Sequence, residues 1–366
     1  MDTPQGTTVV VHFANVEQGS VRRVLEILGL ARQPDPRCRW HEPTLLTVRM
    51  GLELFSGTLE QLREVPGVKR VVQVPREGLL STFARGASPV VVSLPNGQKI
   101  GGGGLTVIAG PCSVEGEAQV CEIAEMVRDA GADALRGGAF KPRSSPYDFG
   151  GLGVDGLVHL AAARRKTGLP VVTDVLDADD LDVVAEHADV IQIGTRSMQN
   201  FPLLFKAGKH PSRKPVLLKR GFGSTIDELL LAAEYVLLGR IVVDATEPGV
   251  ILCERGIRTF EPSSRFTFDV TAIPVLKERT RLPVFADPSH PAGTRRYVPA
   301  LARAATAAGA DGLLMEVHSQ PASSWCDPEQ AMGPQAFRQL MGELRGIESL
   351  LRRRASPESA EAVRRA

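Results

Sequence analysis

Residues 170–195 read PVVTDVLDADDLDVVAEHADVIQIGT, with two short apolar runs on either side of a more polar stretch. The runs PVVTDV (170–175) and VIQIGT (190–195) are continuous and rich in β-branched residues, which is typical of strands buried on both faces. The stretch between them, DADDLDVVAEHA (177–188), has the apolar spacing of an amphipathic helix. This segment therefore predicts a strand, a covering helix and a second strand parallel to the first.

The same alternation recurs throughout residues 105–318. The eight apolar runs are LTVIAG (105–110), ADALRGG (132–138), PVVTDV (170–175), VIQIGT (190–195), VLLKRG (216–221), VILCERG (250–256), PVFADPS (283–289) and GLLMEVH (312–318). Eight such units are the count of a TIM barrel. A doubly wound open sheet is the alternative, but its first strand usually precedes G-x-G-x-x-G, whereas the first run here ends in AGPCS. We predict an α/β fold with a (β/α)8 TIM barrel over residues 105–352.

Residues 1–75 follow a different pattern. They contain three strand-like runs and two helix-like stretches, which are TTVVVHFA (7–14), SVRRVLEILGL (20–30), TLLTVRMGL (44–52), TLEQLREVPGV (58–68) and KRVVQV (69–74). This βαββαβ-like alternation predicts a small α+β ferredoxin-like domain.

Two further segments complete the predicted organisation. Residues 76–104 form a linker with a hairpin around Asn96-Gly97, placed to plug the N-terminal mouth of the barrel, and GGGG (101–104) reads as a flexible junction. Residues 353–366 have little to bury and predict a disordered tail.

The composition excludes several classes of protein. The net charge of +1 gives no general attraction to nucleic acid or to a membrane, so an anion site has to come from local clustering. No apolar run approaches the roughly 18 residues that span a bilayer, and the first residues lack a secretion signal. The five cysteines are odd in number and scattered, which favours reduced thiols in the cytoplasm.

Positive side chains follow several of the predicted strands, at the barrel face where functional residues gather. They are Arg136, Lys141, Arg143, Arg196, Lys219, Arg220 and Arg255. Cations that converge in a partly dry pocket repel one another unless anions occupy it, so we expect substrates with several negative groups. Pro142 and Pro146 restrict the backbone around Arg143 and Ser144, which favours an anion clamp there. The alternative is that some of these cations pair with barrel carboxylates or face solvent.

A second set of residues has the chemistry of metal ligands. Cys112, His290 and Glu316 lie at the ends of the first, seventh and eighth runs, and Asp327 lies in the loop after the eighth. Because strand eight neighbours strand one in a closed barrel, we expect these side chains to meet. A thiolate, an imidazole and two carboxylates accept Mn²⁺, Fe²⁺, Co²⁺ or Zn²⁺. Alternatively, Cys112 is a small buried core residue and His290 a structural histidine.

Two neighbours complicate this metal set. Cys326, adjacent to Asp327, is a competing thiol, and His318 is a candidate for substrate contact or for a structural role.

Seven motifs occur in a familiar order over about residues 90–345. They are AGPCSVE, RGGAFKPRSSP, LLKRG, ILCERGIRTFE, DPSHPAG, MEVHSQP and CDPEQ. Together they resemble the type I 3-deoxy-D-arabino-heptulosonate 7-phosphate (DAHP) synthases, and in particular the β-type branch with an N-terminal ferredoxin-like domain. The resemblance implies a transferase that condenses phosphoenolpyruvate with erythrose 4-phosphate and releases phosphate, the first step of the shikimate pathway to chorismate and the aromatic amino acids.

The resemblance also implies roles for individual residues. One divalent metal ion would be held by Cys112, His290, Glu316 and Asp327. Phosphoenolpyruvate would be held by Arg136, Lys141, Arg196, Lys219 and Arg255, and the phosphate of erythrose 4-phosphate by Pro142, Arg143 and Ser144. Lys141 would lie near the reacting centre, where it is our candidate acid for the new alkoxide. Cys112 and His290 would be catalytic through the metal.

Two residues depart from the pattern of this family. Asp174 stands where Glu is common, and Ser319 stands where Pro is usual. Asp174 makes this position resemble that of the sister family, the 3-deoxy-D-manno-octulosonate 8-phosphate (KDO8P) synthases, which use arabinose 5-phosphate. That family typically has KANRSS where this chain has KPRSSP, so Pro142 and Arg143 favour erythrose 4-phosphate. A non-catalytic anion-binding barrel is the remaining rival.

The expected partners also come from the resemblance. They are the two substrates, an aromatic amino acid effector such as tyrosine or phenylalanine at the N-terminal domain, and further copies of the chain in a homotetramer. No nucleic acid or membrane is expected.

Overall fold

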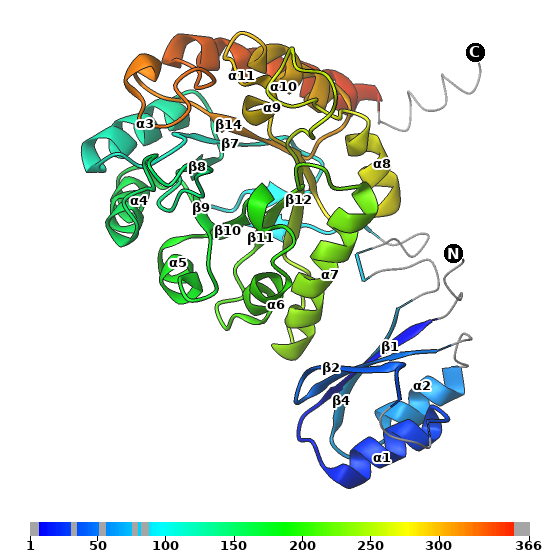
Figure 1. Ribbon diagram of the computed structural model, residues 1–366. Coiled ribbons are helices and arrows are strands. Elements are labelled where there is room, and N and C mark those ends of the chain that lie inside the picture. Colours follow the sequence, from blue (N-terminus) through cyan, green and yellow to red (C-terminus); the bar gives the residue numbers. More distant parts are fainter. Residues whose placement is uncertain (1–6, 31–34, 51–55, 75–79, 82–87, 355–366) are drawn as a thin grey trace, which may run out of the picture.

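The computed structural model describes residues 7–30, 35–50, 56–74, 80–81 and 88–354. Its larger part is a closed barrel of eight parallel strands, which confirms the predicted α/β fold (Figure 1). In chain order the strands are β7 (Thr106–Gly110), β8 (Ala134–Arg136), β9 (Val171–Val175), β10 (Val190–Ile193), β11 (Val216–Lys219), β12 (Val250–Glu254), β13 (Val284–Ala286) and β14 (Gly312–Glu316). Strand β14 pairs with β7 and closes the ring.

Helices surround this barrel. They are α3 (Glu117–Asp129), α4 (Val154–Thr167), α5 (Leu181–His187), α6 (Phe201–Lys209), α7 (Ile226–Val242), α8 (Ala272–Arg279), the short α9 (Ser289–Ala292), α10 (Val298–Ala307) and α11 (Pro334–Arg354). Every strand residue of the barrel is buried, which is why the runs are apolar without alternation. Helix α11 ends two residues beyond the predicted barrel boundary, and residues 355–366, where the tail was expected, lie outside the described residues. No described helix is long and apolar enough to cross a membrane.

A hairpin lies against the interior of the barrel. Strands β5 (Val92–Ser93) and β6 (Lys99–Ile100) pair antiparallel, and Val92 and Ile100 join the buried cluster that contains Ile108 and Phe285 of the barrel strands. At Gly101, where a flexible junction was expected, the chain instead packs closely. A Cβ atom there would lie 2.5 Å from the Val90 carbonyl oxygen, and φ is +83°, so only glycine fits.

The N-terminal domain has the predicted βαββαβ order. Its elements are β1 (Thr8–Phe13), α1 (Gln18–Ile27), β2 (Cys38–Glu42), β3 (Leu45–Arg49), α2 (Ser56–Arg63) and β4 (Val68–Val74), and the sheet order is β2-β3-β1-β4. All three pairings are antiparallel, as in a ferredoxin-like fold. Strand β2 was not among the predicted elements, because its residues CRWHE are mostly polar and lie at the edge of the sheet.

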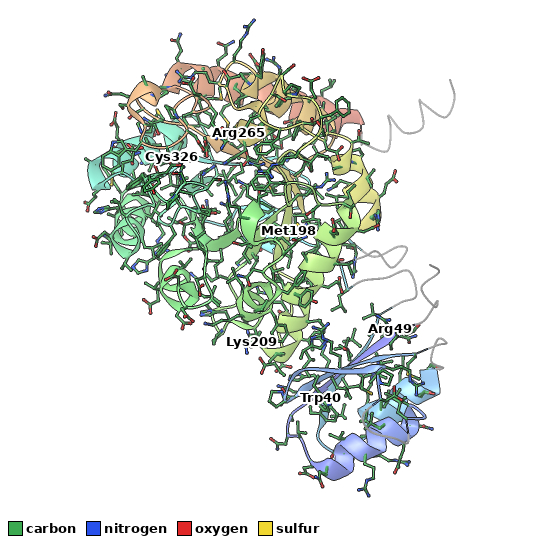
Figure 2. The ribbon with its side chains drawn as sticks, viewed as in Figure 1. Trp40, Arg49, Met198, Lys209, Arg265 and Cys326 are labelled. Atoms are coloured by element: carbon green, nitrogen blue, oxygen red, sulfur yellow. The ribbon has the colours of Figure 1, made fainter. Side chains whose placement is uncertain are left out.

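The small domain contacts the barrel beside α6 and α7 (Figures 1 and 2). An apolar cluster joins Val10, Leu45 and Val74 of the sheet to Ile241 of α7. Two ion pairs, Lys69–Asp244 and Lys209–Glu42, connect the same two parts. The connecting segment is also held, because the Glu234 carboxylate of α7 accepts hydrogen bonds from the backbone N–H groups of residues 80 and 81 at 2.7 and 2.8 Å.

Candidate active site

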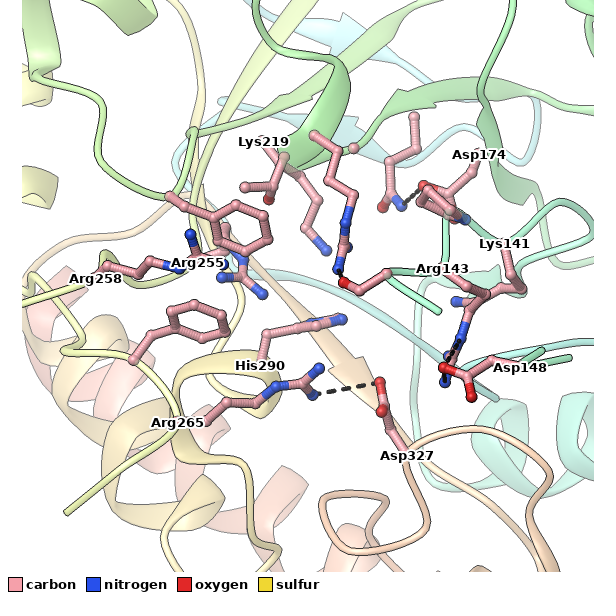
Figure 3. Close-up of a pocket in the computed structure, with 18 of the residues that line it drawn as sticks. Lys141, Arg143, Asp148, Asp174, Lys219, Arg255, Arg258, Arg265, His290 and Asp327 are labelled. Carbon is pink, nitrogen blue, oxygen red and sulfur yellow. Dashed lines mark hydrogen bonds and ion pairs between the residues drawn. The ribbon is translucent and has the colours of Figure 1, made fainter. Parts of the chain in front are cut away.

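A cavity of about 280 Å³ opens among the loops that follow the barrel strands (Figure 3). Of the candidate residues, those that line it are Arg136, Lys141, Pro142, Arg143, Ser144, Arg196, Lys219, Arg255, His290 and Asp327. They come from the ends of five of the eight strands and from the loop after β14. The barrel thus gathers in one place side chains that are up to 191 positions apart in the sequence, from 136 to 327.

Arg136 and Lys141 form the inner cationic edge of the cavity. Arg136 ends β8 and is 3% exposed, and its Nη1 lies 3.1 Å from Glu316 Oε1. Lys141 Nζ donates to the Cys112 carbonyl oxygen at 2.9 Å and to its Sγ at 3.2 Å. Although burial lowers the pKa of Lys141, the nearby Cys112, Cys326 and Asp174 raise it overall. Lys141 therefore remains an ammonium group at neutral pH.

The KPRSSP loop forms the outer edge. Arg143 donates to the Asp148 carboxylate at 3.3 Å and to Cys326 Sγ at 2.8 Å. Ser144 Oγ accepts a hydrogen bond from Arg196 Nη2 at 2.8 Å. This loop is therefore tied both to the thiol side of the cavity and to its cationic side.

Lys219 and His290 share one carboxylate. Asp287 Oδ2 accepts from Lys219 Nζ at 2.6 Å and from His290 Nδ1 at 2.6 Å. Although burial raises the pKa of Asp287, the charges of His290 and Lys219 lower it well below its usual value. The ionised Asp287 fixes the tautomer of His290 with the proton on Nδ1, which leaves Nε2 free to act as a ligand.

Arg255 is the least compensated cation of the cavity. It is 3% exposed, and its Nε and Nη1 atoms are buried without a hydrogen-bond partner. Burial lowers its pKa to about 10, so the charge persists at neutral pH. A buried cation in this state favours an anionic ligand.

Two candidates lie elsewhere. Arg220, expected among the anion-binding cations, does not line the cavity and pairs with Glu254 and Asp269 at 2.8 Å each. His318 Nε2 lies 3.6 Å from Glu115 Oε2 and also outside the cavity lining. Arg220 is therefore a structural ion-pair partner that links the ends of β11 and β12. His318 contacts Glu115 and does not face the cavity.

Around the β14–β7 seam the four candidate metal ligands form two groups that share Asp327, and of the four only His290 and Asp327 line the cavity. His290 Nε2 lies 3.4 Å from Glu316 Oε1, and Cys112 Sγ lies 3.7 Å from Asp327 Oδ2. Asp327 belongs to both groups of side chains that could hold a metal ion, one with His290 and Glu316 and the other with Cys112 and Cys326. Cys326 Sγ lies only 2.9 Å from Cys112 Sγ, so the structure keeps the competing thiol beside the expected one.

The donor set fits a metal ion. With the proton of His290 on Nδ1, its Nε2 lone pair faces Glu316 Oε1, which is buried and accepts no hydrogen bond. Burial lowers the pKa of His290, and although burial raises that of Glu316, its neighbours His290, Arg136 and Lys141 lower it to about 2. Two lone pairs aimed at each other are satisfied by a cation between them.

The comparisons with known proteins agree with this geometry. The profile of the DAHP synthetase I family matches residues 89–351, which is most of the chain and all of the barrel strands. The chain belongs to the DAHP synthetase I family.

Individual members of this family and related enzymes are also similar. Phospho-2-dehydro-3-deoxyheptonate aldolase of Thermotoga maritima is 49% identical over 69% of this chain and 72% of its own. A crystal structure of that DAHP synthase matches 95% of this chain and 98% of its own, with a TM-score of 0.72 and 39% identity. The 2-dehydro-3-deoxyphosphooctonate aldolase of Acidithiobacillus ferrooxidans is 32% identical over 69% of this chain and 92% of its own.

Several residues that line this cavity were not predicted from the sequence, and four of them are arginines and phenylalanines that lie together. They are Phe222, Arg258, Arg265 and Phe266. Arg265 Nη1 lies 3.4 Å from Asp327 Oδ2 and donates to Gln330 Oε1 at 2.8 Å. Arg258 and Arg265 lie in the segment between β12 and α8. Arg258 belongs to the motif ILCERGIRTFE, which could have identified it, whereas Arg265 lies in none of the quoted motifs.

Proposed function

We propose that this chain is a 3-deoxy-7-phosphoheptulonate synthase, a transferase that condenses phosphoenolpyruvate with erythrose 4-phosphate. The observation that carries the proposal is a cavity that is lined by many cations, including the buried and unpaired Arg255, and that borders a thiol–imidazole–carboxylate cluster through His290 and Asp327. The cations suit two phosphorylated substrates, and the cluster suits one divalent metal ion. Family membership supports the same reaction.

The proposed roles come from the family resemblance, and the lining of the cavity supports them. Arg136, Lys141, Arg196, Lys219 and Arg255 bind the phosphate and carboxylate of phosphoenolpyruvate, while Pro142, Arg143 and Ser144 meet the phosphate of erythrose 4-phosphate. Cys112, His290, Glu316 and Asp327 hold the metal. When bound, the metal supplies a Lewis acid for the aldehyde. Its identity among Mn²⁺, Fe²⁺, Co²⁺ and Zn²⁺ is not decided by this donor set.

The residues then act mainly by orientation. The cationic wall fixes the enol phosphate so that its C3 forms a bond to the aldehyde carbon of the second substrate. The aldehyde oxygen takes a proton, for which Lys141 is the candidate acid, since its Nζ lies 3.2 Å from the Sγ of the expected metal ligand Cys112. Water then adds at C2, and the phosphate group leaves from the resulting hemiketal.

The test is phosphate release from phosphoenolpyruvate with each aldose, in the presence and absence of a chelator. We expect release with erythrose 4-phosphate, loss of release with the chelator, and recovery on addition of Mn²⁺. Release with arabinose 5-phosphate alone would identify the sister activity, which the 32% identical relative carries in its name. Release with neither aldose would support a non-catalytic barrel.

We further propose that the small domain binds an aromatic amino acid as effector. A pocket of about 620 Å³ lies between α1 and the edge strand β2, with Trp40 on one side and the opposite charges of Arg22 and Glu26 on the other. An indole face suits an aromatic ring, and the two charges suit an amino acid's carboxylate and amine. Trp40→Ala should abolish inhibition by tyrosine or phenylalanine and leave uninhibited turnover unchanged. Inhibition of the variant at wild-type concentrations would exclude this pocket.

Two broader proposals rest on family resemblance. We infer a homotetramer, which light scattering on the purified protein would contradict by giving a monomer mass. We infer a cytoplasmic enzyme, in keeping with its five free cysteines, and recovery of the protein from the periplasm or medium would contradict this.

A further inference from the structure

One wall of the cavity concentrates positive charge without neutralising it. Arg196, Arg255 and Arg258 all line the cavity, and none has a carboxylate within ion-pair distance among the described residues. A fourth arginine, Arg265, pairs with Asp327. Burial and the charge of Arg265 lower the pKa of Arg196, which shows that these cations repel. Of these arginines only Arg255 is buried, so water screens part of the repulsion at the exposed Arg196 and Arg258, and neighbouring groups other than carboxylates offset the rest.

Two aromatic rings lie among these arginines. Phe222 and Phe266 stack with their centroids 5.1 Å apart and their planes at 18°. The guanidinium carbons of Arg196, Arg255 and Arg258 lie 5.2, 5.0 and 4.8 Å from the centroid of Phe222. Those of Arg255 and Arg265 lie 4.3 and 5.8 Å from that of Phe266. Each distance is within the range of cation–π attraction.

The two rings are themselves fixed by the backbone. The Phe222 carbonyl oxygen accepts a hydrogen bond from Arg258 N at 2.6 Å, and Phe266 N donates to the Pro291 carbonyl oxygen at 3.1 Å. A Cβ atom on Gly256 would lie 2.9 Å from Phe266 Cβ, so the glycine after Arg255 lets this ring approach the strand end. The rings therefore sit in defined positions over the arginines.

A ring face attracts a cation differently from a carboxylate. Its quadrupole stabilises the guanidinium electrostatically but accepts none of its in-plane hydrogen bonds, so the N–H donors remain available. A carboxylate partner would occupy those donors and cancel the charge. The stacked rings thus allow several arginines to lie close together and still present full charge and free donors to a ligand.

We propose that Phe222 and Phe266 are positioning residues for phosphoenolpyruvate, which hold Arg196, Arg255 and Arg258 as an unneutralised cluster for its phosphate and carboxylate. This inference rests on the proposed function. It assigns to two apolar loop residues a role in substrate affinity, exerted through the arginines and not by contact with the reacting atoms.

The test compares Phe222→Leu with Phe222→Tyr in the full chain with its metal. Leucine keeps apolar bulk but lacks the quadrupole, so we expect KM for phosphoenolpyruvate to rise about tenfold while kcat changes less than about threefold. Tyrosine keeps the ring face, so its KM should stay within about twofold of wild type. Phe266→Leu should raise the same KM, since that ring lies nearest to Arg255. Phe201→Leu is the matched control, because Phe201 stacks on Tyr235 with no described guanidinium over its ring.

Calorimetric titration with inorganic phosphate separates this proposal from the proposed function. If wild type releases no phosphate from the two substrates, the function fails, yet weaker phosphate binding by Phe222→Leu than by wild type would still support the role of the rings. Wild-type KM and phosphate affinity in both leucine variants would overturn it. An equal loss in the leucine and tyrosine variants of Phe222 would also overturn it, because shape and not the ring face would then be responsible.

Discussion

Lys141 is the residue whose environment best matches a proton donor. Its ammonium group lies between the Cys112 carbonyl oxygen and thiol, and its raised pKa keeps it protonated. We predict that Lys141→Met lowers kcat at least a hundredfold, as expected for loss of a general acid, and leaves the metal content unchanged by mass spectrometry. Lys166→Met, which removes an exposed partner of Glu125, serves as the control. Near-normal turnover of Lys141→Met would exclude the role.

At the scale of single residues, the sequence predicted which cations line the cavity better than it predicted which of them form ion pairs. The cations at strand ends were legible because a barrel brings those ends together, and all but one of the seven line the cavity. Arg220 was the exception, because its partners Glu254 and Asp269 belong to the next strand and a distant loop. Phe222 and Phe266 were missed because an apolar residue in a loop has no local signal for what lies over its ring.

Helices α6 and α7 cross so closely that glycine is required at the contact. A Cβ atom on Gly208 would lie 2.1 Å from the Val236 carbonyl oxygen, and one on Gly239 would lie 2.6 Å from Phe205 O. We predict that Gly208→Ala destabilises the protein by about 1–3 kcal/mol through overpacking, measured by urea unfolding. Gly342→Ala in α11 has nothing within 4 Å and should instead be neutral or stabilising by up to about 1 kcal/mol. Equal stability of the two variants would show that the helices can separate without cost.

The elements that the sequence predicted are those buried on both faces. All eight barrel strands appear because a short continuous apolar run is best buried as a strand that is covered on both faces. Strand β2 was missed because an edge strand with one exposed side needs no apolar run, and Trp40 and Arg39 are both exposed. The close crossing of α6 and α7 was not predicted either. In the sequence, Gly208 and Gly239 only indicate low helix propensity, and their packing role becomes visible once the positions of both helices are known.

For the molecule as a whole, the contact between the two domains combines apolar packing with charge. Asp244, just beyond α7, pairs with Lys69 and lies 3.8 Å from His12 Nδ1. Glu42 of the small domain pairs with Lys209 of α6. The apolar cluster around Val10 and Ile241 supplies most of the attraction, so the ion pairs set the relative orientation of the domains more than their affinity.

The pH dependence of this contact follows from Asp244. The hydrogen bond and charge of Lys69, with the charges of His12 and Arg70, lower its pKa. Because the folded value lies below the unfolded value of about 4, the stabilisation is complete above pH 4 and is lost as pH falls through the lower folded value. Asp244→Asn removes the charge without straining the backbone, since φ here is 48° and asparagine tolerates that region.

We therefore predict that Asp244→Asn lowers stability by less than about 1 kcal/mol at pH 7, measured by thermal unfolding, and by progressively less as pH falls through the lowered folded pKa of Asp244. Glu42→Gln should act in the same direction, and the double variant should increase the radius of gyration in X-ray scattering if the ion pairs fix the domain orientation. In the double variant, Lys69 and Lys209 each lose their carboxylate partner across the domain contact, while the apolar cluster is unchanged. A stability difference between Asp244→Asn and wild type that does not shrink as the pH is lowered step by step from 7 into the acid range would show that the Asp244 carboxylate does not act through its charge.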